Sequence, residues 1–286
     1  MIKPVCLDCT WNKNMNKYPE DADPALVKDY QARLRQLLDS KASEWNVPEM
    51  GSYIKQLRRE IFHQEEFDYS DVKYHFNELL LSFAQQMTDH IREAEDPVLM
   101  AVKYAMAGNY IDFAVLNVEE ETLWDLIGKA EELTVDRDTY RKFLHEAAKA
   151  KTLTYITDNC GEIVMDKLLI MELKKVNPEL DVTVMVRGAK VANDTTIEDA
   201  VQTGIPSVAK VLDNGTWMDG TILHALSEEA RSSIIHADMV IAKGQANYES
   251  LAGCGLNVFY LFICKCALFM ERFGVEKFSG VLVAER

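Results

Sequence analysis

The chain has 286 residues and a formal net charge of −15. This negative charge leaves little reason to expect nucleic acid or an anionic membrane as a partner. It also disfavours a phosphorylated substrate, unless a metal ion or a local group of Lys and Arg supplies positive charge. No run of about 18 apolar residues is present, so no membrane-spanning helix is expected.

The first residues, MIKPVCLDCTWNKN, contain no apolar segment typical of a secretory signal. We therefore expect a cytoplasmic protein. In that compartment the six cysteines are expected to be reduced thiols or metal ligands rather than disulfides.

Residues 1–149 are predicted to form a helical region. Apolar residues recur at helical spacing from residue 23 onward, and Pro24 and Pro97 suit the first turn of a helix. The segment 70–94 has an apolar stripe along its whole length, which predicts one long amphipathic helix. A further helix is expected to include residues 123–130.

Residues 150–286 are predicted to form an α/β domain, because short apolar runs alternate with helical stretches. The expected strands are 152–157, 182–186, 207–212, 239–242 and 258–263, and the expected helices are about 161–176, 195–203, 220–235 and 245–252. This alternation indicates βαβ units and a mostly parallel sheet covered on both faces. The fold class is therefore a Rossmann-like three-layer α/β/α domain, with the helical region packed on it.

Polar side chains follow four of the five expected strands. The carboxyl ends of parallel strands meet at one edge of a sheet, where ligands of open α/β sheets bind. The residues at this edge are Asp158, Asn159, Glu162, Arg187, Asn193, Asp194, Lys243, Gln245, Asn247, Glu249 and Lys265.

The residue types at this edge indicate a metal and phosphate site. Asp158, Asn159 and Asp194 offer hard oxygen ligands, which suit Mg²⁺ or Mn²⁺ and leave positions open for water and phosphate. Lys243 and Lys265 are expected to hold the phosphate from the other side. A divalent ion and two lysines would supply locally the positive charge that the chain lacks, an arrangement that suits phosphoryl chemistry.

Each of these features also has a simpler structural explanation. Asp or Asn after a strand is commonly a helix cap, glycines at strand ends serve turns, and Lys243 could be a solvated loop residue. The sequence has no Walker A pattern and no G-x-G-x-x-G, so nucleoside triphosphates and dinucleotides are not favoured as ligands.

Several motifs together resemble one known family. They are DNCGE, RGxxVxND, ADxVIAKGQANYE, a late KC, AGNYIDF at 107–113 and an N-terminal CLDC. In this order and spacing they are similar to the metal-dependent damage-control phosphatases (the domain of unknown function 89 family), in their prokaryotic branch. The resemblance extends from Cys6 to about Val283. It implies a phosphatase that hydrolyses small phosphomonoesters, often sugar phosphates or damaged phosphometabolites, with Mn²⁺, Co²⁺, Ni²⁺ or Mg²⁺.

The resemblance also implies roles for individual residues. Asp158, Asn159 and Asp194 match the metal ligands of the family. The remaining residues are expected to contact the substrate, with Lys243 also catalytic: Asn109, Asp112, Glu162, Arg187, Asn193, Lys243, Asn247 and Lys265.

One departure from the family pattern is Lys190. Relatives usually have Pro at this position after the RG motif, and a lysine there is expected to alter which molecules enter the pocket.

In the mechanism that these residues suggest, a metal-activated water attacks the phosphoryl group in line. Asp112 or Glu162 is expected to orient that water, while the lysines neutralise the phosphoryl oxygens. Attack by an aspartate to form a phosphoenzyme is an equally permitted alternative.

The cysteines suggest an alternative of another class. Cys6 and Cys9 have half of a zinc-site spacing, and Cys264 and Cys266 could complete it. A zinc ion or thiol cluster would then stabilise a binding module. Buried or idle thiols are the simpler explanation.

A third possibility keeps the pocket without catalysis, as a sugar-phosphate sensor. In each case with a pocket the expected partner is a small phosphorylated metabolite. The natural substrate, the physiological metal and the oligomeric state are left open by the sequence.

Overall fold

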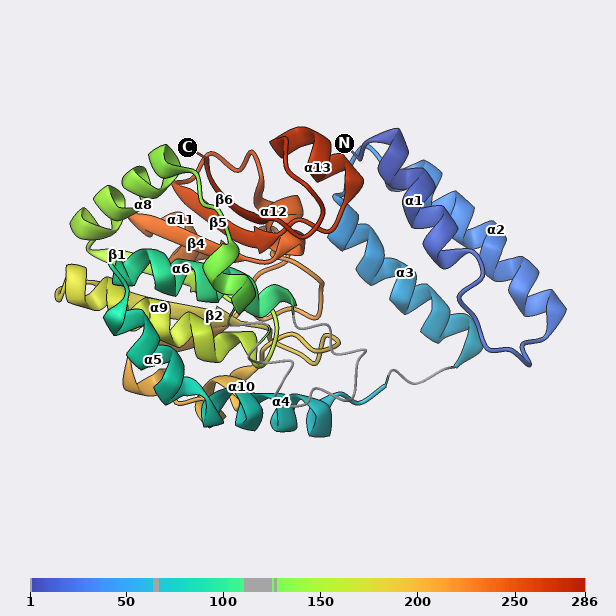
Figure 1. Cartoon of the computed structure of the whole chain (residues 1–286). Helices are drawn as coiled ribbons and strands as arrows, with labels where there is room; N and C mark the ends of the chain where they lie inside the picture. Colours follow the sequence, from blue (N-terminus) through green and yellow to red (C-terminus); the bar gives the residue numbers. More distant parts are fainter. Residues whose placement is uncertain (1, 64–66, 111–124, 126–127, 286) are drawn as a thin grey trace.

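The computed structural model describes residues 2–63, 67–110, 125 and 128–285 of the chain. Its centre is a six-stranded sheet of order β3-β2-β1-β4-β5-β6 (Figure 1). The strands are β1 (Thr152–Ile156), β2 (Asp181–Val186), β3 (Lys210–Asp213), β4 (Met239–Lys243), β5 (Val258–Ile263) and β6 (Gly280–Glu285). Neighbouring strands are parallel except β5 and β6. The predicted α/β fold with a mostly parallel sheet is confirmed, although the sequence analysis did not find β6.

Helices cover both faces of this sheet. Tyr155 of β1 faces one apolar core, whereas Ile156 faces another, as the alternation of side chains along a strand requires. The helices that contribute buried residues to the first core include α6 (Pro97–Ala107), α8 (Arg137–Lys149), α9 (Glu162–Val176) and α10 (Ile197–Gln202). Those of the second core include α11 (Glu228–Ile235), α12 (Gln245–Leu251) and α13 (Ala267–Phe273). The result is the predicted three-layer arrangement.

The first three helices form a unit with an apolar cluster of its own. They are α1 (Pro4–Asn14), α2 (Pro24–Lys41) and α3 (Val47–Phe62). In Figure 1 they stand to the right of the sheet, and α3 packs against α12. The later helices of the N-terminal half instead share the first core of the sheet with β1 and β2. The predicted division after residue 149 stays a prediction.

The single helix predicted for 70–94 is wrong, because the chain bends at Phe83. The two observed helices are α4 (Ser70–Ser82) and α5 (Ala84–Glu93). The Phe83 N–H bonds to the carbonyls of Leu80 and Leu81, and its φ of −102° departs from the helical value. The bend keeps both Leu80 and Met87 in the core. Two helices that meet at Phe83 therefore bury the apolar stripe of this segment.

The helix predicted for 220–235 begins late, at Glu228, with Ser227 as its cap. Residues before it form a loop in which Gly220 has a φ of +70° and its carbonyl accepts a hydrogen bond from Arg187. The helix predicted for 123–130 lies mostly outside the described residues. Within the described part of the chain, no helix is both long and apolar enough to cross a bilayer.

Asn77 of α4 connects the helical half to the strand-end loops. Its Oδ1 accepts a hydrogen bond from the Gly161 N–H at 2.6 Å, and its Nδ2 donates to Asp199 Oδ1 at 2.9 Å. The side chain is fully buried. The turn between β1 and α9 therefore depends on a residue 84 positions earlier in the chain.

We predict that Asn77→Ala lowers the free energy of unfolding by about 2–4 kcal/mol, because a buried N–H and a buried carboxylate lose a partner. Urea denaturation measures the change. The control is Tyr74→Ala on the same helix, where the side chain is exposed and a change within about 0.5 kcal/mol is expected. Equal midpoints for the two variants would contradict the role assigned to Asn77.

Candidate active site at the carboxyl edge of the sheet

Two strand-end loops are joined by backbone hydrogen bonds. The Thr195 N–H donates to the Asp158 carbonyl at 2.8 Å, and the Cys160 N–H donates to the Asn193 carbonyl at 2.9 Å. Between these bonds, Asn159 and Asp194 form an isolated antiparallel bridge. The loop after β1 and the loop after β2 are thereby held side by side, which places Asp158 and Asn159 next to Asp194.

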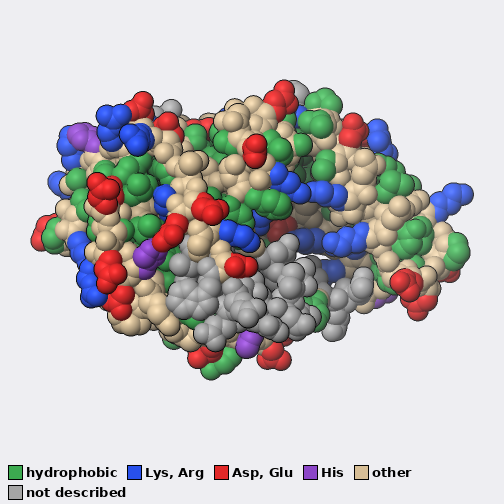
Figure 2. Space-filling model, viewed as in Figure 1, with side chains coloured by type: hydrophobic (Ala, Val, Ile, Leu, Met, Phe, Trp, Pro, Cys, Tyr) green, Lys and Arg blue, Asp and Glu red, His purple; other side chains and the backbone are tan. Residues whose placement is uncertain are grey.

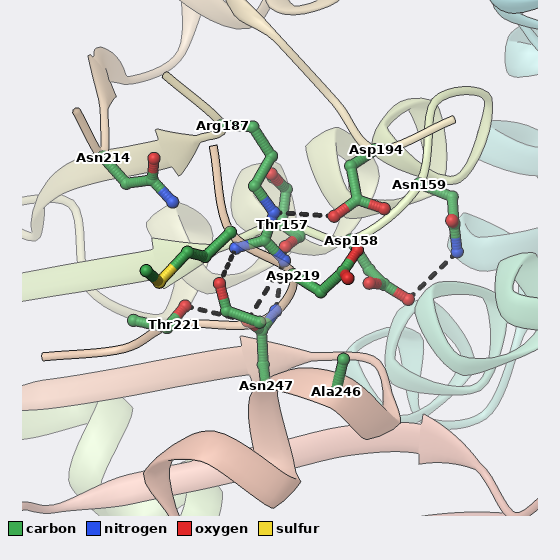
Figure 3. A network of polar contacts seen from close by, with 12 residues as sticks. Thr157, Asp158, Asn159, Arg187, Asp194, Asn214, Asp219, Thr221, Ala246 and Asn247 are labelled. Atoms are coloured by element: carbon green, nitrogen blue, oxygen red, sulfur yellow. Dashed lines mark hydrogen bonds and ion pairs between the residues drawn. The ribbon is translucent and has the colours of Figure 1, made fainter. Parts of the chain in front are cut away.

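Asp158 lies at the centre of a polar network (Figure 3). Its Oδ2 accepts hydrogen bonds from Asn109 Nδ2 at 2.9 Å and from Asn159 Nδ2 at 3.0 Å, the bond that Figure 3 draws. Asn109 comes from the end of the helical half, just after α6. Gly244 also lies against this carboxylate, since a Cβ atom there would be only 2.1 Å from Asp158 Oδ2. A glycine is therefore required beside this carboxylate.

Asp194 is held by Arg187 at the end of β2. The Arg187 Nε donates to Asp194 Oδ2 at 2.6 Å, and the guanidinium also contacts the Gly220 carbonyl and Asn247 Oδ1. Asn247 in turn donates to the Thr157 carbonyl at 3.0 Å. Because Arg187 is buried and fixed by these contacts, the carboxylate of Asp194 is fixed with it.

Negative charge is concentrated at this point. Burial raises the pKa of Asp158 to about 8, and the charges of Asp194 and Glu162 add to this rise. Burial also raises the pKa of Asp194, while Arg187 opposes the rise and Asp219 adds to it. Figure 3 shows the side chains of Asp158, Asp194 and Asp219 close to one another. The repulsion between neighbouring carboxylates adds to the effect of burial in raising these pKa values, and added positive charge would relieve it.

Below this site lies a buried ion-pair network. The ammonium of Lys243 donates to Asp166 Oδ1 at 2.7 Å, to the Ala105 carbonyl at 2.6 Å and to Glu162 Oε1. Lys243, Glu162 and Asp166 are fully buried. Burial disfavours the charged ammonium, but the carboxylates of Asp166 and Glu162 outweigh this and raise the pKa of Lys243. Burial raises the pKa of Asp166 to about 6, and the Lys243 charge opposes that rise.

This geometry does not fit the expected contact of Lys243 with phosphate. An ammonium has three protons, and all three are directed at Ala105, Glu162 and Asp166. The sequence could show that a lysine lies at the carboxyl end of β4, but not that two carboxylates of α9 enclose it. Glu162 has a similar placement, because its Oε2 accepts from the amides of Asn109 and Asn159.

The other expected site residues are placed as follows. Asn193 donates its amide to Asn159 Oδ1 at 2.9 Å, so it belongs to the network. Lys265 is exposed just after β5, and among the described residues none pairs with its ammonium. Asp112 lies outside the described residues.

Asp219 is the residue of this site that the sequence analysis missed. It follows β3, in the segment DNGTWMDGT, and its Oδ1 pairs with Lys55 of α3 at 2.6 Å. The segment had been assigned in part to a helix beginning at 220. Its Gly, Asn, Asp and Thr content after a strand was the signal that could have indicated a loop.

The zinc alternative finds no support. The charges of Cys266 and Cys9 raise the pKa of Cys6, after the larger effect of burial, so these thiols lie in one neighbourhood. However, no three His, Cys, Asp or Glu side chains of the described ranges are arranged to hold a metal ion. That absence concerns only His, Cys, Asp and Glu side chains. The oxygen site expected from the sequence includes the amide of Asn159, which is outside this set.

Comparison with known proteins identifies the family. A family model described as the damage-control phosphatase ARMT1-like domain matches residues 2–281. The chain belongs to this family.

Relatives of the family match along nearly the whole chain. A damage-control phosphatase of Archaeoglobus fulgidus is 31% identical, over 99% of this chain and 98% of that protein. An uncharacterized protein of Methanocaldococcus jannaschii is 29% identical, over 99% of this chain and 95% of that one. The crystal structure of a DUF89 family protein from Pyrococcus horikoshii superposes with a TM-score of 0.80 at 26% identity, covering 100% of this chain and 99% of that one. The resemblance noted in the sequence is confirmed, and with it membership among damage-control phosphatases.

We predict that Gly244→Ala displaces the Asp158 carboxylate and lowers the affinity for Mn²⁺ by at least about tenfold, as calorimetric titration would measure. The control is Gly253→Ala. Gly253 has a φ of +82°, close to the +79° of Gly244, but a Cβ there meets no atom within 4 Å. Both variants share the backbone strain of about 1–3 kcal/mol, and the first alone adds the collision. Equal metal affinities in the two variants would contradict the close approach.

We predict that Lys243→Met lowers the free energy of unfolding by about 3–5 kcal/mol, because two buried carboxylates lose their counter-charge. Denaturant titration measures this. Lys167→Met is the control, since Lys167 is half-buried and donates to the Thr203 carbonyl without a carboxylate partner. If Lys243→Met kept its full stability but had a raised KM for phosphate esters, a direct contact between Lys243 and phosphate would be supported instead.

Proposed function

We propose that this protein is a metal-dependent phosphatase that hydrolyses small phosphomonoesters, such as sugar phosphates or damaged phosphometabolites. The observation that carries the proposal is the meeting of Asp158, Asn159 and Asp194 through the paired loops after β1 and β2. Membership in the damage-control phosphatase family supports it.

The residues at this edge fit a divalent cation. Asp158 and Asp194 supply carboxylate oxygens, and Asn159 supplies an amide oxygen, which are the ligand types that Mg²⁺ and Mn²⁺ take. The nitrogen end of the Asn159 amide is bound by Asp158 and Glu162, at 3.0 Å and 3.2 Å. Its Oδ1 accepts the Asn193 amide at 2.9 Å, and a carbonyl oxygen keeps a second lone pair for a cation. We assign the metal to these three residues, with Mn²⁺, Co²⁺, Ni²⁺ or Mg²⁺ as candidates.

A bound cation of this kind would polarise a phosphoryl oxygen and lower the pKa of a bound water. The surrounding residues keep the ligands in place. Arg187 fixes Asp194 and favours its ionised form, and Asn109 fixes Asp158. Glu162, itself fixed by Lys243, orients the Asn159 amide. In this proposal Glu162 and Lys243 are positioning residues below the site rather than groups that touch the substrate.

The substrate side of the site is assigned from the exposed residues. Lys265 follows β5 and is accessible, and its Nζ donates to no described residue, so it remains the lysine that we propose for phosphate. Asn193 lies at the rim through its contact with Asn159, at 2.9 Å. Asn247 is fully buried and holds Arg187 and the Thr157 carbonyl, which makes its role indirect.

We predict that the wild-type protein hydrolyses p-nitrophenyl phosphate with Mn²⁺ or Co²⁺, and that Asp158→Asn lowers kcat/KM by at least about a hundredfold, because a charged ligand becomes neutral at nearly constant volume. The metal dependence is measured with Mn²⁺, Co²⁺, Ni²⁺ and Mg²⁺ after chelation by EDTA. The control is Asp138→Asn, an exposed acid on α8, for which activity equal to wild type is expected.

Two outcomes would reject the proposal. Hydrolysis that is undiminished in EDTA would exclude the metal. Equal inactivity of wild type and Asp158→Asn across all four metals and a panel of phosphate esters, with retained binding of those esters, would indicate a non-catalytic sensor instead.

A further inference from the structure

A cleft of about 470 Å³ lies beside the acidic site. It runs between α3 and the loops after β2 and β3, and the residues lining it are Ser52, Lys55, Gln56, Arg59, Glu60, Lys190, Val191 and Trp217. Figure 2 shows Lys and Arg side chains gathered in the hollow between the unit of α1–α3 and the rest of the molecule. We call this the α3 cleft.

The α3 cleft adjoins the proposed metal ligands on two sides. The Val191 carbonyl accepts a hydrogen bond from the backbone N–H of Asp194 at 2.9 Å. One wall of the cleft therefore belongs to the same loop as a proposed metal ligand. On the other side, Lys55 donates to Asp219 at 2.6 Å, and Figure 3 shows Asp219 beside Asp158 and Asp194. A molecule with its phosphate at the metal site can therefore extend into this cleft.

The charge of the α3 cleft is opposite to that of the whole chain. Three cations line it, and the single acid among its described lining residues, Glu60, pairs with Arg33 outside it at 3.3 Å. Lys55 is neutralised by Asp219. Lys190 pairs with Asp68, but both side chains are more than 60% exposed, so this pair is weak. Within the described chain the guanidinium of Arg59 has no partner.

Nearby cations raise the local potential further. Burial lowers the pKa of Lys17, and the positive charges of Arg58 and Lys55 lower it again. In a chain with a net charge of −15, such a local collection of positive charge stands out from the rest of the surface and attracts an anion to the cleft.

One wall of the α3 cleft is aromatic. Trp217 is 43% exposed and packs edge-on against Tyr53, with ring centroids 5.6 Å apart. Tyr53 stacks on Trp45 at 4.2 Å. These contacts fix the indole as an apolar surface beside the cations, suited to the carbon skeleton of a small metabolite.

We propose that the α3 cleft binds a second anionic group of the substrate, so that the preferred substrates are phosphorylated metabolites with a further phosphate or carboxylate. Arg59 and Lys190 are the specificity-determining residues. This inference rests on the proposed phosphatase function and names the substrate class of the same site. A single phosphate on a neutral skeleton would leave the cations of the cleft without a partner, whereas a second anion would pair with them.

The test compares substrates that differ in the second anion. Fructose 1-phosphate is compared with fructose 1,6-bisphosphate, and glucose 6-phosphate with 6-phosphogluconate, which distinguishes a second phosphate from a carboxylate. Phosphate release is measured at buffered free Mn²⁺ for wild type, Arg59→Ala and Lys190→Ala. The control is Arg92→Ala, an exposed helical arginine on α5 that pairs with Asp89 at 2.8 Å. Figure 1 places α5 on the far side of the molecule from α3.

We expect wild type to have a higher kcat/KM for at least one of the two doubly anionic substrates. The ratio to the matching monophosphate should fall about tenfold in Arg59→Ala and in Lys190→Ala, as expected for loss of a charge-assisted contact. Arg92→Ala should keep the wild-type ratio. A wild-type ratio of one or less for both pairs would overturn the inference. So would variants in which kcat/KM falls equally for both members of a pair.

A binding experiment separates this inference from the proposed function. Calorimetric titration of Asp158→Asn with the same four compounds measures affinity without turnover. The wild-type protein could hydrolyse none of them while the doubly anionic compounds bind more tightly in an Arg59-dependent manner. In that case the phosphatase proposal fails, and the anion-binding role of the α3 cleft is supported. If hydrolysis occurs but affinity ignores the second anion, the cleft inference alone is rejected.

Discussion

The backbone bridge between Asn159 and Asp194 is the constraint on which the site depends. Parallel strands bring their carboxyl ends to one edge, but the loops that follow them are free to diverge. Here the loop after β1 and the loop after β2 exchange hydrogen bonds on both sides of the bridge. Side chains on a rigid pair of loops keep their relative positions without a ligand, which is the preorganisation that a metal site requires.

Holding several acids at one place requires positive charge, and three cations supply it to all of these acids but one. Arg187 pairs with Asp194, Lys55 with Asp219, and Lys243 with Glu162 and Asp166. Asp158 has no cation of its own among the described contacts and accepts amide hydrogen bonds instead. The negative charge of its carboxylate is consequently the least compensated of the group. A bound metal ion would supply the missing positive charge.

The sequence was sufficient for the architecture and for the position of Asp158, Asn159 and Asp194 at one edge of the sheet, because both follow from local patterns. Alternating apolar runs specify parallel strands, and polar residues directly after a strand must lie at its carboxyl end. The bend at Phe83 was not predictable in this way, since an apolar stripe satisfies the core equally well as one helix or as two. The placement of Asp219 depended on a loop that carries Gly220 at positive φ, where a helix had been expected. The partners of Lys243 come from 81 and 77 positions away, a separation at which sequence pattern gives no information.

Burial decides which cations of such a site are available to a substrate. Lys243 is fully buried and donates all its protons within the protein, so its charge stabilises the scaffold beneath the ligands. Arg59 and Lys190 are exposed; Lys190 is weakly paired and Arg59 has no partner within the described residues, so their charge is available at the surface of the cleft. A lysine at the carboxyl edge of the sheet is thus occupied within the protein, while an arginine on a helix of the N-terminal unit lines the open cleft. The packing of α3 against α12 is what makes that possible, because it brings a helix of the N-terminal unit to the carboxyl edge of the sheet.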